Sequence, residues 1–387
     1  MENLSLYLHV PFCTVRCSYC AFNVYIHLEH LIHPFVTALL REIEITGKAN
    51  PGLPVHTIYF GGGTPTLLTA EQFEQILEAI DRHFHVDDNA EISTEANPDD
   101  LLDANFTQQL RGTGINRLSI GVQSTVQSEL EMFGRLHDAD TVAQAVSNSR
   151  AAGFNSLNLD LMYGNPQQTL PMWEQSLQDT IALNPDHFSL YALGLEPNTA
   201  MDYWVNNGKL PHPDEDLAAD MYDIATAVLA NNGFGQYEIS NWANPGHESR
   251  HNLQYWYNAP YLGLGPGAHG YAGGVRYHNI RSPHKYIKAL HDDRADWQFP
   301  LTPVIAESTE VSRDDEISET IMMGMRLLHE GLSLAGFEHR FGVSLLDIRG
   351  DVIARYEQQG GLTLTDDRLL LTERGRLVSN RILRDLI

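Results

Sequence analysis

Short apolar runs alternate with longer helical patterns over the first half of the chain. The runs lie at residues 4–10, 57–60, 91–97, 117–123, 156–164 and 187–193. Between them the periodicity predicts helices at 33–45, 70–84 and 140–153, with Thr69 and Asp140 as N-caps. Strands that alternate with helices predict an α/β fold with a parallel sheet. Six such units could form an open sheet or a partial (β/α)6 barrel, and periodicity does not separate these alternatives.

The pattern changes after about residue 235. Residues 241–275 are rich in aromatic residues, glycine and proline. Residues 314–387 contain a Met-rich helical stretch, a short hairpin and a helix that begins near Thr372, as in a winged helix. We therefore predict three parts, which are a partial β/α barrel at 1–235, an aromatic- and glycine-rich connecting region at 236–310 and a small, mainly helical domain at 311–387.

Polar residues or glycines lie near the carboxyl ends of five consecutive predicted strands. They are His9 with the loop that follows it, the segment Gly61 to Thr64, Glu95, Gln123 and Asp160. In β/α architectures the carboxyl ends of the strands meet on one face, where ligand-binding groups gather. Any one of these residues alone is more often an ordinary polar residue, but the series predicts a site on that face.

All the cysteines of the chain, Cys13, Cys17 and Cys20, lie within eight residues. Clustered thiolates are usually ligands of soft metals. They could bind zinc, with His9 as a fourth ligand, or an iron–sulfur cluster. A [4Fe–4S] cluster normally takes four cysteines. Three cysteines would therefore leave one iron open to an outside ligand.

Composition limits the classes of partner. The chain has 50 acidic and 25 basic residues, a formal charge of −25, which argues against nucleic acid or an anionic membrane surface as the main partner. We recognise no signal peptide and no apolar stretch of membrane-spanning length. Three closely spaced cysteines do not suit a disulfide framework, so we expect a cytoplasmic protein without a transmembrane segment.

The cysteine spacing, followed by an aromatic residue, resembles the signature of radical S-adenosylmethionine (radical SAM) enzymes. The segment Gly61-Gly62-Gly63-Thr64-Pro65 is similar to the glycine-rich segment of that family, in which residues without a Cβ let the backbone approach a ligand. The resemblance implies a [4Fe–4S] cluster on the three cysteines, with S-adenosylmethionine on the open iron. In that family the reduced cluster cleaves a C–S bond to give a 5′-deoxyadenosyl radical. Zinc is then the minor alternative.

Within the superfamily the chain resembles the oxygen-independent coproporphyrinogen III oxidase-like group. The stretches that carry this resemblance are YFGGGTPTLL, ISTEANP, INRLSIGVQS, LDLMYGNPQQT and YALGLEPNT. The resemblance implies that Glu95 contacts a first S-adenosylmethionine, and that Gln123, Arg135 and Asp160 match residues that contact a second one. An arginine suits the carboxylate of the methionine part. The full set of implied nucleotide-binding residues is Tyr7, Tyr19, Gly62, Gly63, Thr64, Glu95, Gln123, Arg135 and Asp160.

Two departures argue against oxidase activity and are typical of the haem-chaperone branch of that group. Phe22 stands where the oxidase has a fourth cysteine, and the chain starts three residues before the first strand, without the oxidase's N-terminal arm. His251 to Trp256 match the HNxxYW motif of the chaperone branch. Haem iron takes an imidazole ligand and the macrocycle takes aromatic walls, so we interpret His251 as a haem ligand, with His269 as the weaker candidate. A hydrogen-bonded structural histidine is the competing interpretation.

The resemblance implies a haem chaperone that binds a [4Fe–4S] cluster, S-adenosylmethionine and haem, and delivers haem to haem-requiring respiratory enzymes. Bacterioferritin-like proteins are candidate haem donors, and contact with a membrane would be transient and through the clients. The alternative is an oxygen-independent coproporphyrinogen III oxidase that decarboxylates propionates by radical chemistry. A haem-degrading radical methyltransferase is a more distant alternative.

Overall fold

The computed structural model describes residues 4–291 and 297–387, which are built around one large sheet. The strand order is β12-β11-β10-β9-β1-β2-β3-β4-β5-β6-β8-β7. From β1 to β6 the strands are parallel and follow one another in chain order, as the alternating pattern predicts. These strands are β1 (Leu4–Val10), β2 (Pro54–Gly62), β3 (His85–Ala96), β4 (Arg117–Gln123), β5 (Leu157–Tyr163) and β6 (His187–Ala192).

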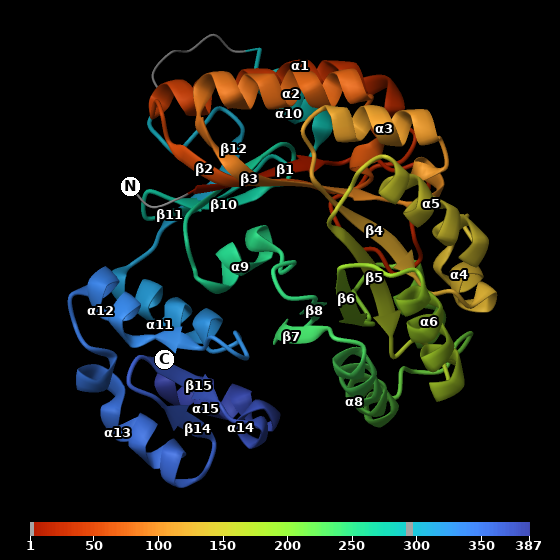
Figure 1. The fold of residues 1–387 in the computed structure, drawn as a ribbon. Coiled ribbons are helices and arrows are strands. Elements are labelled where there is room, and N and C mark those ends of the chain that lie inside the picture. The colour runs from red at the N-terminus through yellow and green to blue at the C-terminus, as the bar shows by residue number, and fades with distance from the viewer. Residues whose placement is uncertain (1–3, 292–296) are drawn as a thin grey trace.

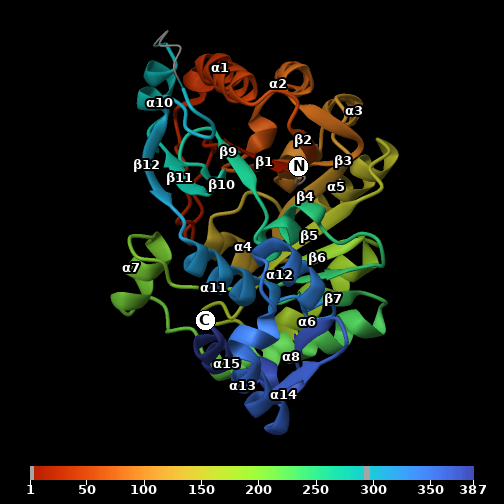
Figure 2. The same ribbon diagram turned by 90° about the vertical axis from the view of Figure 1, so that its left-hand side faces the viewer.

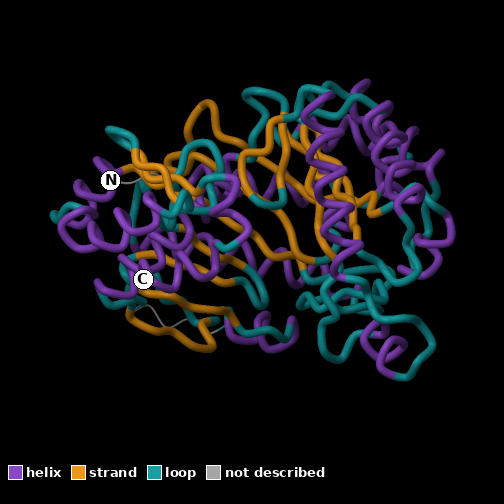
Figure 3. Tube along the Cα trace, turned by 90° about the horizontal axis from the view of Figure 1, so that it is seen from below, coloured by secondary structure: helices purple, strands orange, loops and turns teal. Residues whose placement is uncertain are grey.

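Figure 1 shows these strands arranged along an arc, with helices on its outer side, and Figure 3 shows the same arrangement from below. The helices between the strands are α1 (Ile32–Ala49), α2 (Ala70–His83), α3 (Ala104–Gly112), α4 (Gln127–Phe133), α5 (Ala139–Ala151) and α6 (Leu170–Ala182). Thr69 caps α2 in a capping box with Gln72, which confirms the predicted start. The cap predicted at Asp140 is wrong, because α5 begins earlier and Asp138 accepts the N–H of Thr141 at 2.8 Å.

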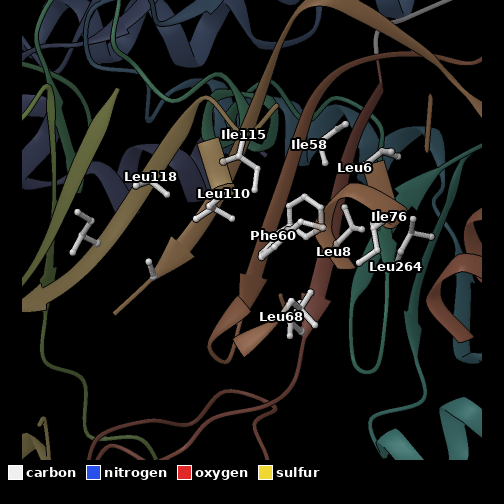
Figure 4. Close-up of a cluster of buried hydrophobic side chains, with 14 of the residues drawn as sticks. Leu6, Leu8, Ile58, Phe60, Leu68, Ile76, Leu110, Ile115, Leu118 and Leu264 are labelled. Carbon is white, nitrogen blue, oxygen red and sulfur yellow. The ribbon is translucent and has the colours of Figure 1, made fainter. Parts of the chain in front are cut away.

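The main hydrophobic core lies between the parallel strands and the outer helices (Figure 4). Every second residue of a strand points into it, as Leu6 and Leu8 of β1 and Ile58 and Phe60 of β2 do, and Ile76 of α2 packs against them. The strand β4 is buried at every position. The other face of the sheet, on the inside of the arc, is left for polar side chains.

Residues 235–310 extend the sheet at both edges. The strands β7 and β8 pair at the β6 edge, whereas β9 pairs parallel to β1 and leads into an antiparallel β10–β12 sheet. Between these two groups, α9 lies on the inner side of the arc (Figure 1). The elements are α7 (Ala200–Asn206), α8 (Glu215–Asn231), β7 (Gly235–Glu238), β8 (Asn241–Ala243), α9 (Arg250–Trp256), β9 (Tyr261–Leu264), β10 (His269–Ala272), β11 (Val275–Asn279), α10 (Pro283–Ala289) and β12 (Ile305–Glu310).

The rest of the chain forms a second hydrophobic core of its own, around residues 317–386. As predicted, it contains a hairpin, β14 with β15, and a helix capped by Thr372. Figure 2 shows this part below the β9–β12 edge of the sheet. Its elements are α11 (Arg313–Gly324), β13 (Leu332–Ser333), α12 (Leu334–Phe341), α13 (Leu345–Gln358), β14 (Leu362–Leu364), β15 (Arg368–Leu371), α14 (Glu373–Leu377) and α15 (Ser379–Leu386).

Polar contacts hold this C-terminal part against the loop after α9. The guanidinium of Arg340 donates to Glu316 at 2.6 Å and to the carbonyl oxygen of Asn258 at 2.9 Å. The side chain of Asn258 donates in turn to the Thr320 hydroxyl at 3.1 Å. The C-terminal part is therefore attached close to the inner side of the arc. The boundaries predicted at residues 235 and 310 stay a prediction.

Candidate functional site

The loop after β1 carries the three cysteines and is attached to distant parts of the chain through its backbone. The N–H of Cys13 donates to the carbonyl oxygen of Tyr25 at 3.0 Å, and Cys20 N–H closes a turn onto Cys17 at 3.1 Å. Ser18 N–H reaches the carbonyl oxygen of Phe133 at 3.0 Å. The cysteines are free thiols and line one cavity of about 680 Å³, called the cluster cavity below.

The chemistry of these sulfurs fits a metal cluster. Burial raises the pKa of the Cys13 thiol to about 11, and burial also raises the pKa of Cys20. Three thiolates in one cavity therefore require a positive partner, which an iron–sulfur cluster supplies. The zinc alternative with His9 fits less well, because Tyr7 and the Asn23 carbonyl each lie 3.0 Å from a ring nitrogen of His9. Within residues 4–291 and 297–387, we find no three cysteine, histidine or carboxylate groups arranged to hold one metal ion.

The inner face of the sheet delivers polar groups to the same cavity. Because side chains alternate along a strand, residues on the inner face follow each other with a period of two. The structure brings together most of the predicted nucleotide-binding residues in the cluster cavity. Those that line it with the cysteines are Tyr19, Gly62, Gly63, Thr64, Glu95, Gln123, Arg135 and Asp160.

The glycines at the end of β2 serve a close approach to the cysteine loop. A Cβ on Gly62, whose φ is +114°, would lie 2.4 Å from the His9 ring, and one on Gly63 would lie 2.5 Å from the Phe12 carbonyl oxygen. The N–H groups of Gly62, Gly63 and Thr64 donate to Glu95, Val10 and Phe12 at 2.7–3.0 Å. No amide donor of these residues is left for an anion, so the segment is not built as a phosphate loop.

Two carboxyl groups on the inner face are held by neutral donors. Glu95 accepts from the Tyr59 hydroxyl and from Gly62 N–H, each at 3.0 Å. Burial raises its pKa to about 7, and the neighbouring Asp160 adds to this shift. Asp160 accepts from Asn158 at 2.7 Å and from Ser119 at 3.1 Å, and burial raises its pKa as well. These carboxyl groups are fixed in place and suit the hydroxyl and ammonium donors of a polar ligand.

Arg135 is the side chain best placed to bind a ligand carboxylate. One terminal nitrogen donates to Asn97 at 2.6 Å and the other to the Tyr19 hydroxyl at 2.9 Å. Its Nε is buried and has no acceptor among the described residues. A buried donor without a partner is costly, so a ligand carboxylate at this position would satisfy it. Gln123 beside it has a φ of +67°, a strained conformation that is often found at ligand sites.

Tyr7 and His251, the other two predicted ligand-binding residues, do not line the cluster cavity. Tyr7 lines a neighbouring cavity of about 550 Å³, called the histidine cavity below. Its lining includes three histidines, His9, His269 and His278, and the guanidinium-bearing Arg281. Both cavities share part of their lining, namely Ala21, Phe22, Gly62 and Glu95.

His251 is buried and contacts one lining residue of each cavity, Tyr59 of the cluster cavity and Tyr255 of the histidine cavity. Its Nδ1 lies 2.8 Å from the Thr57 hydroxyl and its Nε2 lies 3.0 Å from the Tyr255 hydroxyl. Its ring stacks on Tyr59, with centroids 5.0 Å apart. Burial lowers its pKa to about 3, so the ring is neutral. Because both nitrogens are engaged, haem iron could reach Nε2 only if Tyr255 moved away.

Several residues of the site were missed by the sequence analysis. Tyr59, Asn97 and Tyr191 line the cluster cavity, and Tyr261 and Arg281 line the histidine cavity. The period of two along β2 and β6 could have found Tyr59 and Tyr191, since they alternate with core residues. Asn97 has no such signal, because its role depends on contact with Arg135.

Comparison with known proteins agrees with this geometry. The radical SAM superfamily matches residues 7–180, and the HemN C-terminal domain matches residues 311–378. Proteins named heme chaperone HemW from Bacillus subtilis and Mycobacterium tuberculosis are each 37% identical to this chain. The first alignment covers 98% of this chain and 97% of the relative, and the second covers 100% and 95%.

The solved structure of coproporphyrinogen III oxidase (HemN) from Escherichia coli superposes with a TM-score of 0.84 and 24% identity. It covers 99% of this chain and 90% of the other. At this identity the likeness shows the fold alone. The fold and the matched domains thus define a radical SAM protein. Because the full-length relatives exceed 30% identity, the chain belongs to the HemW family of heme chaperones within that superfamily.

No helix in the described part of the chain is both long and apolar enough to cross a bilayer.

Proposed function

We propose that the protein is a haem chaperone with a [4Fe–4S] cluster on Cys13, Cys17 and Cys20 and S-adenosylmethionine in the cluster cavity. The observation that carries this proposal is the convergence of three free thiols and the strand-end polar groups in one cavity. Its relatives that are named heme chaperones support the haem-binding part. Delivery to haem-requiring respiratory enzymes, and receipt of haem from bacterioferritin-like donors, follow from the same resemblance.

The protein's own groups match the parts of S-adenosylmethionine. The fixed carboxyl group of Glu95 suits a donor of a first S-adenosylmethionine, and the Nε of Arg135 and the carboxyl group of Asp160 suit the carboxylate and a hydroxyl donor of a second one. A bound cluster with an open iron would supply a ligand site for the methionine part and an electron.

The test is anaerobic reconstitution of the full chain with iron and sulfide. We expect about four iron and four sulfide ions per chain, and an electron paramagnetic resonance spectrum of the reduced protein that changes when S-adenosylmethionine is added. Cys17→Ser is expected to lose the cluster signal, and Ser344→Ala, an exchange of similar size at a helix cap far from the loop, is the control. A single zinc ion, or no metal in the wild type, would overturn the proposal.

The same preparation separates the chaperone from the oxidase. We expect it to bind hemin with a stoichiometry near one and to transfer haem to an apo-respiratory haem protein. We also expect coproporphyrinogen III to stay unconverted under reducing conditions with S-adenosylmethionine. Formation of protoporphyrinogen IX would replace the chaperone with the oxidase.

A further inference from the structure

The histidine cavity is a second candidate ligand site, next to the cluster cavity. It measures about 550 Å³, which lies in the usual range of pockets for compact organic ligands. It opens beside the cysteine loop, and aromatic rings form part of its wall. Phe22 is 70% exposed, although it is large and apolar, and Tyr255 and Tyr261 meet edge to face at 4.8 Å. An exposed aromatic residue at the mouth of a cavity indicates a surface for a flat apolar ligand.

Only one of the histidines that line this cavity has its ring free in the described part of the chain. His9 is held between Tyr7 and the Asn23 carbonyl. The ring of His278 lies 3.2 Å from a Glu307 carboxylate oxygen and 3.4 Å from the Asn279 carbonyl oxygen. His269 makes no hydrogen bond to any described residue, and it is exposed on β10 directly opposite His278 on β11.

The side chain of Arg281 places a positive charge at the same cavity. Arg281 is exposed and forms no ion pair with any carboxylate of the described residues. Its Nε contacts Asn23 at 3.4 Å, and its carbonyl oxygen accepts from Asn23 and Tyr25, so its backbone is held in position. The net charge of the chain is −25, so a free arginine at a cavity is notable as a partner for a carboxylate.

We propose that haem binds in the histidine cavity, with His269 as the axial iron ligand, Phe22 and Tyr261 against the macrocycle and Arg281 at a propionate. This inference rests on the proposed haem-binding function and gives it a location. It also changes the interpretation of the motif around His251. His251 becomes a positioning residue, because its Nε2 contacts the Tyr255 hydroxyl, and Tyr255 lines the cavity.

The chemistry of His269 agrees with this assignment. Iron binds a neutral imidazole. Burial lowers the pKa of His269, and the neighbouring His278 and Arg281 act in the same direction. The shared lining at Phe22, Gly62 and Glu95 places the macrocycle next to the nucleotide, so either ligand can affect the binding of the other.

The experiment uses the full chain and hemin, followed by its Soret absorption and its electron paramagnetic resonance spectrum. We expect His269→Ala to weaken hemin binding at least tenfold and to remove the spectral signature of an imidazole ligand. Added imidazole is expected to restore that signature, since the cavity remains. His284→Ala, at an exposed histidine on α10 that does not line the cavity, is the matched control and is expected to bind as the wild type does.

Two further variants make the assignment sharper. Arg281→Gln is expected to weaken hemin severalfold but to leave the affinity for hemin dimethyl ester unchanged, because the ester has no carboxylate. His251→Gln is expected to keep the imidazole signature with a lower affinity. If the wild type binds hemin and His269→Ala keeps both affinity and signature, the location is wrong while the proposed function stands. If the wild type binds no hemin, the proposed haem-binding function is itself wrong.

Discussion

The two cavities share a wall but differ in how their polar groups are held. In the cluster cavity the carboxyl groups of Glu95 and Asp160 are fixed by hydrogen bonds from strand residues, and the guanidinium of Arg135 is fixed by its bonds to Asn97 and Tyr19. In the histidine cavity His269 and Arg281 are exposed, and the imidazole has no hydrogen-bond partner in the described structure. Fixed groups suit a cofactor that stays bound, whereas free groups at an open cavity suit a cargo that must leave.

Hydrogen bonds at the ends of β1 and β2 hold Gly62 and its neighbours close together where the two cavities share lining residues. The imidazole of His9, held by Tyr7 and Asn23, lies against Gly62 with no space for a Cβ. The N–H of Gly62 donates to Glu95 at 3.0 Å. Gly62 thus contacts His9, which lines the histidine cavity, and Glu95, which lines both cavities, so a change at Gly62 is expected to reach both.

We expect Gly62→Ala to have the strongest effect, because it alters the lining of both cavities. Its φ of +114° disfavours any side chain, and the new Cβ would lie 2.4 Å from a ring that is held in place. We expect a loss of about 2–5 kcal/mol in the free energy of unfolding, with weaker binding of both hemin and S-adenosylmethionine. Urea unfolding and both titrations measure this.

Gly350→Ala is the matched control for that substitution. Gly350 lies within α13, and a Cβ there meets no atom within 4 Å. We expect a gain of up to about 1 kcal/mol, since alanine favours a helix. Equal stability of Gly62→Ala and the wild type would show that the residues around Gly62 can move to accept a Cβ. The packing between the two cavities would then not be rigid.

The next effect is expected from Arg135→Gln, which separates the two cavities. Loss of a charged donor to a ligand carboxylate costs about 1.5–3 kcal/mol, which is a 10- to 150-fold loss of S-adenosylmethionine affinity. Iron content and hemin affinity are expected to stay at wild-type values, because Arg135 lines only the cluster cavity. An S-adenosylmethionine titration of the reduced protein, followed by electron paramagnetic resonance, measures this. Unchanged nucleotide affinity would remove Arg135 from the site.

The smallest effect is expected for the pH dependence of stability that His251 causes. Burial lowers the pKa of His251 to about 3, below its ordinary value of 6.5. Its contribution to stability is therefore fully present above pH 6.5 and is lost as the pH falls below 6.5, because only the unfolded chain binds the proton. The expected slope is about 1.4 kcal/mol for each pH unit in that range.

His251→Gln tests this contribution, because glutamine does not titrate. Urea unfolding at pH 7.5 and pH 5 is expected to show a smaller loss of stability on acidification than in the wild type. His284→Gln is the matched exposed control and is expected to follow the wild type. Parallel pH profiles for the wild type and His251→Gln would contradict the assignment of a neutral, buried imidazole.

The local features of this protein can be predicted from its sequence. The six parallel strands, the capping box at Thr69 and the cysteine loop depend on residues close together in the chain, so their periodicity and spacing predict them. The series of strand-end residues also led to the cluster cavity, because parallel strands bring their carboxyl ends to one face. The observed cap of α5, Asp138, lies two residues before the predicted cap, Asp140. Both are aspartates, and only packing selects Asp138.

The roles of the histidines and the division into two cavities depend on contacts between distant parts of the chain. His251 meets Thr57 and Tyr59 across about 190 residues of chain, and His269 meets His278 through the pairing of β10 with β11. A histidine's chemistry depends on whether its ring nitrogens are engaged, and that depends on neighbours that no local pattern encodes. The motif at His251 was therefore visible in the sequence, but its contacts with the lining of the cavities were not.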